Sequence, residues 1–165
     1  KTIFENISFS ESAKIRKEMK NCLKIEVKKE HLLWSLLIQF DTLCQMRHAI
    51  VHSSRGLAGK NAVKMNIPSY NENVIVNIGY SEVQECASIC TALVCEMNTM
   101  LFIEMAKRWA TDWRDDYFWD EKKEKDSFDK LWDVFCSLID TRDDTFNSLS
   151  KTKCKHAIKK EYHLT

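Results

Sequence analysis

The stretch LLWSLLIQFDTLCQMRHAIVH, residues 32–52, is the most apolar helical segment of the sequence, and it ends in one arginine and two histidines. Its apolar residues recur at the three- and four-residue spacing of an amphipathic helix. They are Leu33, Leu36, Leu37, Phe40, Leu43, Cys44, Ile50 and Val51. A glycine-containing break follows at 53–60. The pattern therefore predicts a long helix that packs one face on a core and ends at a loop.

Arg47 is the unexpected residue of this helix. It follows Leu33 by fourteen residues, which is about 320° round the helix axis, and so it falls on the apolar arc. A guanidinium keeps its charge, and burying it without a partner is costly. We therefore expect Arg47 to meet a carboxylate, a carbonyl or a bound anion. His48 and His52 are four residues apart at the edge of the same arc, so three polar side chains should converge on one crevice.

Other readings of these residues stay open. A lone arginine here is usually a structural ion pair, and a lone histidine is usually a hydrogen-bonded boundary residue. Two histidines four residues apart can share a zinc ion, but the pair lacks the glutamate of His-Glu-x-x-His and has no evident third ligand. Gly56-x-x-Gly59-Lys60 lacks the full spacing and the preceding strand of a phosphate-binding loop. Neither a metal nor a cofactor is expected.

Arg-His-x-x-x-His at the end of a long apolar helix resembles the Arg-x(4–6)-His motif of the HEPN superfamily, all-α domains named for higher eukaryotes and prokaryotes nucleotide-binding. In that family the residue after the arginine is commonly Asn, His or Asp, and here it is His48. The resemblance implies a single HEPN-like domain over residues 1–165. It also implies a metal-independent endoribonuclease whose homodimer joins two motifs in one composite site. Such enzymes occur in toxin, anti-phage and CRISPR-associated systems.

The implied chemistry is attack by the RNA's own 2′-hydroxyl, which leaves a 2′,3′-cyclic phosphate and a 5′-hydroxyl. His52 is the expected general acid or base, and Arg47 is expected to stabilise the charge of the phosphorane. His48 is expected to orient the reacting groups or to carry a second proton. Beyond the helix, Ser54, Arg55 and Lys60 are the predicted substrate-binding residues. Ser54 occupies the place of a tyrosine that is nucleotidylated in some family members, so that route of regulation is in doubt.

The strongest rival is a non-catalytic helical module that binds a nucleotide or a partner protein, as part of a defence or toxin-antitoxin system. In that reading the arginine and the histidines only support the fold. The RNA sequence that would be cleaved, and the signal that would activate cleavage, cannot be read from these residues.

The composition is that of one soluble domain. The 165 residues are 44% hydrophobic and 30% charged, and three glycines and one proline leave few helix breaks. The net charge of +1 gives no global attraction for nucleic acid, so an RNA site has to be a local patch. The seven cysteines form no Cys-x-x-Cys pair and fall mostly at apolar helical positions, which is typical of buried thiols in a reducing compartment.

Localisation and partners follow from what the chain lacks. No apolar run reaches the roughly 18 residues of a membrane span, and the N-terminal region has no signal-peptide segment. We therefore expect a cytoplasmic protein without a membrane partner. The chain begins at Lys1 rather than methionine, which leaves open that it is a piece of a longer protein. A fused sensor domain, a sensor protein or an antitoxin would then be a further partner.

The rest of the sequence predicts the helices around the motif helix. Before it, a helix with a lysine-rich outer face is expected from Ser10 to about Val27. After it come a long connection to Tyr80, which contains the β-prone residues 74–78, and a second long helix started by a capping box at Ser81-Glu82-Val83-Gln84. An aromatic and arginine-rich stretch at 107–119 is expected to be core or dimer surface more often than a base-stacking site, and it is followed by a charged linker at 120–126, an apolar stripe from Phe128 to Ile139 and a basic final helix from Phe146 to Tyr162. The second long helix should pack antiparallel on the motif helix. The predicted fold is an all-α, up-and-down bundle of four or five helices, with a long loop after the motif helix.

Overall fold

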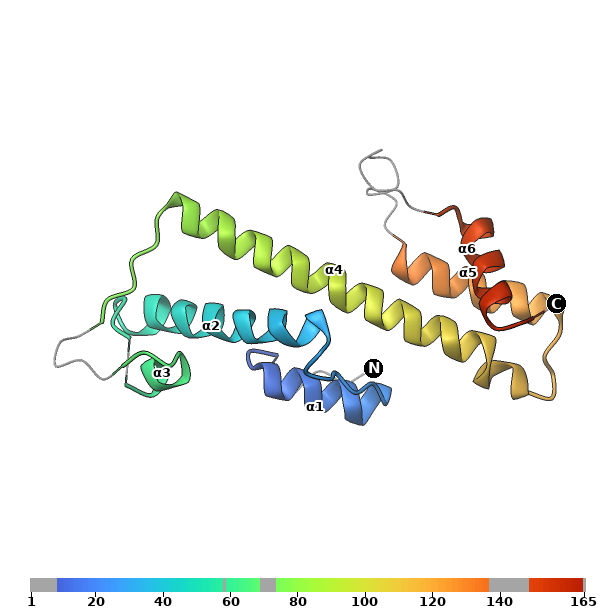
Figure 1. Cartoon of the computed structure of the whole chain (residues 1–165), viewed down its shortest axis with the longest axis horizontal. Helices are drawn as coiled ribbons and strands as arrows, with labels where there is room; N and C mark the ends of the chain where they lie inside the picture. Colours follow the sequence, from blue (N-terminus) through green and yellow to red (C-terminus); the bar gives the residue numbers. More distant parts are fainter. Residues whose placement is uncertain (1–8, 58, 69–73, 137–148, 165) are drawn as a thin grey trace. The chain divides into compact units, whose positions relative to one another are not determined.

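A computed structural model describes residues 9–57, 59–68, 74–136 and 149–164. Over these residues the chain is all-α, as predicted, with six α-helices, one 3-10 turn and no β-strand (Figure 1). The helices are α1 (Ser12–Leu23), α2 (Leu32–His52), α3 (Gly59–Lys64), α4 (Tyr80–Ala110), α5 (Glu121–Phe135) and α6 (Lys151–Glu161). The chain divides into two compact units, Lys1–Met97 and Asn98–Thr165, and α4 runs through the boundary.

In the first unit, α1 is anchored to α2 at its first turn. The backbone N–H of Ser12 donates to Asp41 Oδ1 over 2.6 Å, and the Ser12 hydroxyl donates to Asp41 Oδ2. The first amides of a helix have no partner inside it, so a carboxylate on the neighbouring helix replaces the missing local cap. Behind this contact the two helices and the segment between them bury Ile15, Met19, Ile25, Val27, Leu33, Leu36 and Leu37.

Helix α1 ends four residues earlier than the predicted Val27. Lys24 takes a left-handed conformation with φ 59°, and the N–H of Ile25 bonds to the carbonyl of Met19 over 3.1 Å. This is the Schellman pattern that closes a helix, and it turns Ile25 into the core. The apolar residues up to Val27 are therefore buried as extended chain rather than as helix.

The connection after α2 is partly ordered by its own backbone. The N–H of Leu57 donates to the carbonyl of Val74 over 2.8 Å, and that of Val76 donates to the carbonyl of Arg55 over 2.9 Å. The β-prone segment thus forms an isolated antiparallel bridge, Gly56 to Ile75, instead of a strand. Ala49, Leu57 and Val76 make a small buried cluster on this bridge. Helix α3 lies within what the sequence predicts to be loop.

Helix α4 begins at Tyr80, slightly before the predicted capping box. Glu82 Oε2 accepts from the N–H of Gly79 over 2.9 Å, so Glu82 caps the helix as the capping box requires. The predicted cap Ser81 instead donates its hydroxyl to Glu82 over 3.0 Å. In the first unit α4 runs in the opposite direction to α2 (Figure 1), and Cys90 is close enough to Cys44 to affect its titration. The antiparallel prediction agrees with this arrangement.

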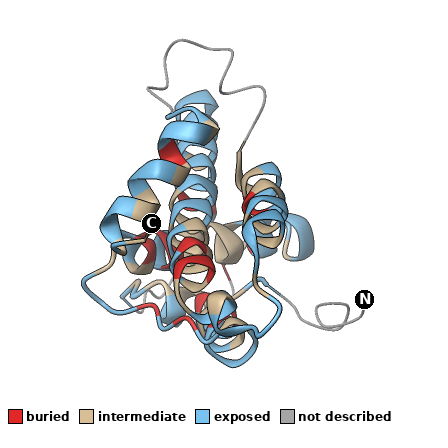
Figure 2. Cartoon of the chain, turned by 90° about the vertical axis from the view of Figure 1, so that its right-hand side faces the viewer, coloured by how far each residue is buried: buried red, intermediate tan, exposed pale blue. Residues whose placement is uncertain are grey.

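Most of the apolar surface of α4 in the first unit is exposed. Leu93 is buried, whereas the apolar residues Val83 and Val94 of the same helix are 55% and 67% exposed. Tyr80–Asp115 is long and apolar enough to span a membrane, with a mean hydropathy of 1.6 over its most apolar window. The sequence predicts no such helix because it holds no uninterrupted apolar run of that length, whereas a mean hydropathy allows for polar residues within the window. Only 6% of that apolar window is buried, and Figure 2 colours the few buried residues red. Core helices of soluble proteins share this length and composition, but they are mostly buried, unlike this window.

The second unit has its own aromatic core. Trp109 and Phe128 are fully buried with ring centroids 4.9 Å apart, and the Trp109 indole donates to Ser127 Oγ over 3.1 Å. The predicted linker 120–126 is wrong, since Asp120 accepts from the N–H of Lys123 over 2.7 Å and caps α5. The charged residues after Asp120 resemble a solvated linker unless Asp120 is recognised as a helix N-cap. The predicted Leu138 and Ile139, and residues 146–148 of the final helix, lie outside the described residues.

Three cations surround one carboxylate in this unit. Glu124 receives Arg114 at 2.7 Å, Lys155 at 3.1 Å and Lys159 at 3.5 Å. Burial raises the pKa of Glu124, but the hydrogen bonds from Lys155 and Arg114 outweigh it and lower that pKa below its usual value. The Arg114 guanidinium also lies 5.0 Å from the ring of Trp109. Trp109 and Trp119 of the aromatic and arginine-rich stretch therefore belong to this core, as predicted, whereas Tyr117 and Phe118 are 93% and 73% exposed.

Candidate functional site

The three motif residues lie in the last two turns of α2, and all three are exposed. The expectation that Arg47 lies against a core is wrong for the single chain, in which Arg47 is exposed. The buried residue of these turns is Ala49, about 200° round the helix from Arg47. Leu57 and Val76, from the connection after α2, pack on Ala49 and bury it. The apolar residues Ile50 and Val51 in the same turns remain exposed. Arg47 consequently reaches solvent without leaving the arc.

The two histidines form a pair. Their ring centroids are 4.9 Å apart and their planes are inclined by 48°, as expected for residues one turn apart on a helix. Neither ring makes a hydrogen bond to any described residue, so the four ring nitrogens are open to a ligand or to water.

Arg47 and His48 line a crevice of about 310 Å³ between α2, α3 and the residues before α1. Its other lining residues are Ser10, Glu11, Cys44, Gln45, Asn61 and Lys64. Asn61 and Lys64 are one turn apart on α3. The crevice therefore combines Arg47 and His48 with a cation and an amide from the short helix α3, whereas His52 is not among its lining residues.

Several donors of this crevice lack acceptors. No carboxylate among the described residues pairs with Arg47, and Asn61 Nδ2 is buried with no hydrogen-bond acceptor in that part of the chain. Lys64 lies 3.6 Å from Glu11, and both side chains are largely exposed, so the contact is weak. Unsatisfied buried donors are rare in proteins and usually mark a missing partner. The arrangement is suited to an anion that accepts from Arg47, Asn61 and Lys64.

Cys44 contributes a thiol to the lining of the crevice. Burial raises the pKa of its thiol, the nearby Asp41 carboxylate raises it further, and Arg47 offsets only part of this. The thiol therefore stays protonated at neutral pH. A protonated thiol is a poor nucleophile, so Cys44 is a wall of the crevice rather than a reactive group.

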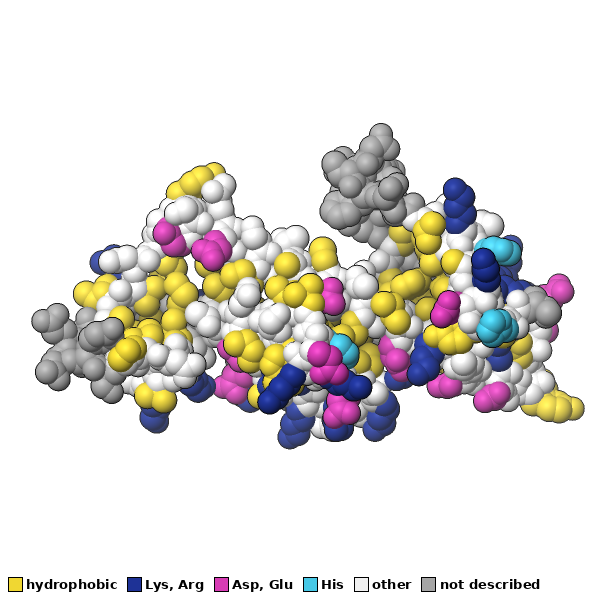
Figure 3. Space-filling view, viewed as in Figure 1, with side chains coloured by type: hydrophobic (Ala, Val, Ile, Leu, Met, Phe, Trp, Pro, Cys, Tyr) yellow, Lys and Arg dark blue, Asp and Glu magenta, His cyan; other side chains and the backbone are white. Residues whose placement is uncertain are grey.

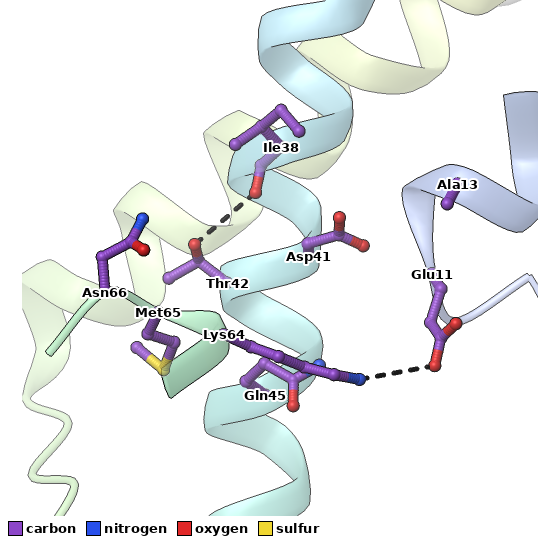
Figure 4. A pocket seen from close by; sticks show the side chains of 9 residues that line it. All are labelled: Glu11, Ala13, Ile38, Asp41, Thr42, Gln45, Lys64, Met65 and Asn66. Carbon is purple, nitrogen blue, oxygen red and sulfur yellow. Dashed lines mark hydrogen bonds and ion pairs between the residues drawn. The ribbon is translucent and has the colours of Figure 1, made fainter. Parts of the chain in front are cut away.

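A second cavity of about 420 Å³ adjoins the first and shares Glu11, Gln45 and Lys64 with it. It is also lined by Ala13, Ile38, Asp41, Thr42, Met65 and Asn66 (Figure 4). The ion pair between Lys64 and Glu11 spans from α3 to the start of α1, where the two cavities meet. The motif therefore opens onto a two-part groove.

No family model, curated protein or solved structure matches this chain.

The three predicted substrate-binding residues do not line either cavity. Ser54, Arg55 and Lys60 are exposed, and Lys64, one turn beyond Lys60 on α3, takes the position expected for Lys60. Ser54 and Arg55 both have left-handed backbones, with φ 47° and 71°, because the N–H of Arg55 bonds to the carbonyl of Ala49 and closes α2. Six residues are too few to show helical periodicity, which is why α3 and its inward face escaped prediction.

The surroundings of the site are basic. Residues 9–68 contain eleven lysines and arginines against five acidic residues, although the whole chain has a net charge of only +1. Figure 3 shows several of these dark-blue side chains along α1, on its solvent side. Residues 9–68 are therefore more basic than the chain as a whole. The described residues contain no group of three or more His, Cys, Asp or Glu side chains that could hold a metal ion.

Proposed function

We propose that the chain is a metal-independent endoribonuclease that cleaves RNA through the 2′-hydroxyl and acts as a homodimer. The observation that carries the proposal is the crevice beside Arg47 and His48, whose donors lack acceptors. A phosphodiester supplies two non-bridging oxygens that match a guanidinium and an amide. The resemblance of Arg47-His48-x-x-x-His52 to the HEPN motif supports the same reaction, and the metal independence rests on that resemblance.

Each motif residue has a role in this reaction. One histidine removes the proton of the 2′-hydroxyl as the oxygen attacks phosphorus, and another returns a proton to the departing 5′-oxygen. His52 is assigned the first or second of these transfers, and His48 orients the reacting groups or carries the other proton. Arg47 stabilises the extra negative charge of the phosphorane, with Asn61 and Lys64 as additional donors.

The homodimer is supported by exposed apolar residues next to the motif. Val51 and Val83 are 56% and 55% exposed. Antiparallel α2 and α4 lie near one another at Cys44 and Cys90, and both valines lie seven residues further toward the same end. Val51 and Val83 are therefore level with each other. A twofold axis through this patch would cover both valines and bring two copies of the motif together.

The direct test is an RNA digest with and without EDTA, followed by analysis of the product ends. Cleavage should persist in EDTA and leave 2′,3′-cyclic phosphates and 5′-hydroxyls, and His52→Ala should remove it. Activity that is lost on chelation and restored by magnesium would indicate a metallonuclease instead. RNA binding without cleavage at any condition would favour the non-catalytic helical module.

A further inference from the structure

The larger cavity beside the motif crevice has a composition that differs from that of a phosphate site. Ile38 and Met65 give it apolar walls, and Thr42, Gln45 and Asn66 place polar groups around them (Figure 4). The charged residues Glu11, Asp41 and Lys64 also line it, so the cavity is amphipathic, with an apolar wall that a flat heterocycle can cover and polar groups that can orient it. The volume of about 420 Å³ is sufficient for one nucleoside.

We propose that this cavity is a base-binding subsite that holds adenine, while the phosphate of the same nucleotide occupies the crevice beside Arg47. The proposal deepens the proposed function and rests on it for the position of the phosphate. It names a preference that the motif alone does not provide. Lys64 lines both cavities and can therefore contact the nucleotide between its base and its phosphate.

The preference for adenine follows from which polar groups are free. Asp41 accepts from Ser12 with both carboxylate oxygens, and Glu11 lies 3.6 Å from both Lys14 and Lys64. The side-chain amides of Gln45 and Asn66 make no hydrogen bond to any described residue. A side-chain amide offers one donor and one acceptor, the pattern that pairs with N6 and N7 of adenine. Cytosine would instead need a carboxylate for its N4 amino group, and Glu11 would have to leave its ion pairs with Lys14 and Lys64 to provide one. Guanine would need an arginine or lysine at O6 and N7, and in this proposal Lys64 is held between the base and the phosphate.

Met65 suits the flat face of the base. Its thioether is flexible and polarisable and makes favourable contacts with aromatic rings. Asn66 follows it in a left-handed conformation with φ 55°, which closes α3 and sets the amide at the mouth of the cavity. The base site is therefore built by the end of α3 on one side and by α2 on the other.

The test is calorimetric titration of the whole chain with AMP, GMP, CMP and UMP, which needs no cleavage. Gln45→Leu removes one amide and keeps the size of the side chain. Gln39→Leu is the matched control, because Gln39 is exposed on the same helix and lines neither cavity. Asn66→Gly is a second variant that removes the other amide and keeps the left-handed backbone.

AMP should bind most tightly, and Gln45→Leu and Asn66→Gly should each weaken it about tenfold. Gln39→Leu should bind as the wild type does. No binding of any mononucleotide at millimolar concentration, equal binding of all four, or binding indifferent to Gln45→Leu would each overturn the base site. AMP binding that depends on Gln45, in a chain that cleaves no RNA, would leave the base site standing and reject the nuclease. RNA cleavage without preference for adenosine would support the nuclease and reject the base site.

Discussion

Asp41 on α2 caps α1 through Ser12, with the backbone N–H donating over 2.6 Å and the hydroxyl donating to the second carboxylate oxygen. The contact holds the start of α1 against α2, and Glu11, one residue earlier, lines both cavities as a result. Arg16 adds a hydrogen bond to the Ser12 hydroxyl over 2.9 Å. One aspartate therefore links the stability of the first unit to the shape of its groove.

Replacing Asp41 should destabilise the fold. Asp41→Ala leaves the buried Ser12 hydroxyl and the first amide of α1 without an acceptor, which should lower the free energy of unfolding by about 1 to 3 kcal/mol. Chemical denaturation measures the change. Glu85→Ala, at an exposed position of α4, is the control and should change the unfolding free energy by less than about 0.5 kcal/mol. Equal stability of the two variants would contradict the capping role.

The sequence predicted the helices well where the local pattern determines them. Helical spacing of apolar residues located α2, and the capping box predicted at Ser81 and Gln84 placed the start of α4 slightly late, since the box that forms joins Gly79 and Glu82. The division of the chain into two compact units was not predicted, because chain length alone does not show where the contacts fall. The errors at α4 share one cause. A helix that is apolar on nearly every side has no pattern that distinguishes the covered strip around Leu93 from exposed positions such as Val94.

The candidate site was predicted from the motif only in part. Arg47, His48 and His52 are adjacent because they share one helix, and that proximity follows from helical geometry alone. Asn61 and Lys64 reach the same crevice through tertiary packing of a six-residue helix, which has no sequence pattern of its own. The exposure of Arg47 depends on where the loop after α2 returns, and this again is a tertiary property.

Removing Arg47 should separate catalysis from stability. Arg47 is exposed and pairs with no described carboxylate, so Arg47→Ala should change the free energy of unfolding by less than about 0.5 kcal/mol. RNA cleavage should nevertheless fall by about 10² to 10³, the usual cost of losing a charge-stabilising donor. Thermal melts and an RNA digest on the same preparation decide the matter. A large fall in melting temperature, with the activity per folded molecule retained, would leave Arg47 a purely structural role.

The exposed patch beside the motif should mediate the dimer. Val83→Glu places a charge in that patch and, in the first turn of α4, should not destabilise the single chain, because an acidic residue suits a helix N-terminus. Light scattering should report a monomer, and cleavage should be lost with the composite site. Val63→Glu, on α3 at 73% exposure, is the control and should stay dimeric and active. A dimeric, active Val83→Glu variant would place the interface elsewhere.

The second unit should lose stability in acid through Glu124. Its pKa is lowered in the folded chain below the ordinary glutamate value of about 4.3, so its stabilising effect is complete above that value and is lost as the pH falls through the lowered pKa. At pH 7, Glu124→Gln should be less stable than wild type by about 1 to 3 kcal/mol, because three cations lose their carboxylate. The difference should shrink as the pH falls through the lowered pKa of Glu124. Denaturation at pH 7 and at a series of acidic pH values measures it, with the exposed Glu121→Gln as control.

The left-handed turn after α2 allows a test of whether Arg55 contacts RNA. Ser54 and Arg55 hold φ 47° and 71°, conformations that cost a residue with a side chain roughly 1 to 2 kcal/mol and that glycine adopts freely. Ser54→Gly and Arg55→Gly should therefore each stabilise the chain, by about 0.5 kcal/mol after glycine's greater freedom in the unfolded state is subtracted. Chemical denaturation measures both variants.

RNA affinity should distinguish the same two variants, because only Arg55→Gly removes a cation. If Arg55 binds a phosphate, as the sequence predicts, its replacement should weaken RNA binding and reduce the slope of log affinity against log salt concentration by about one. Ser54→Gly relieves the same kind of backbone strain and should leave that slope unchanged. A slope that is identical in Arg55→Gly, Ser54→Gly and wild type would remove Arg55 from the RNA site, and Lys64 would then be the nearest cation to Arg47 that the groove supplies.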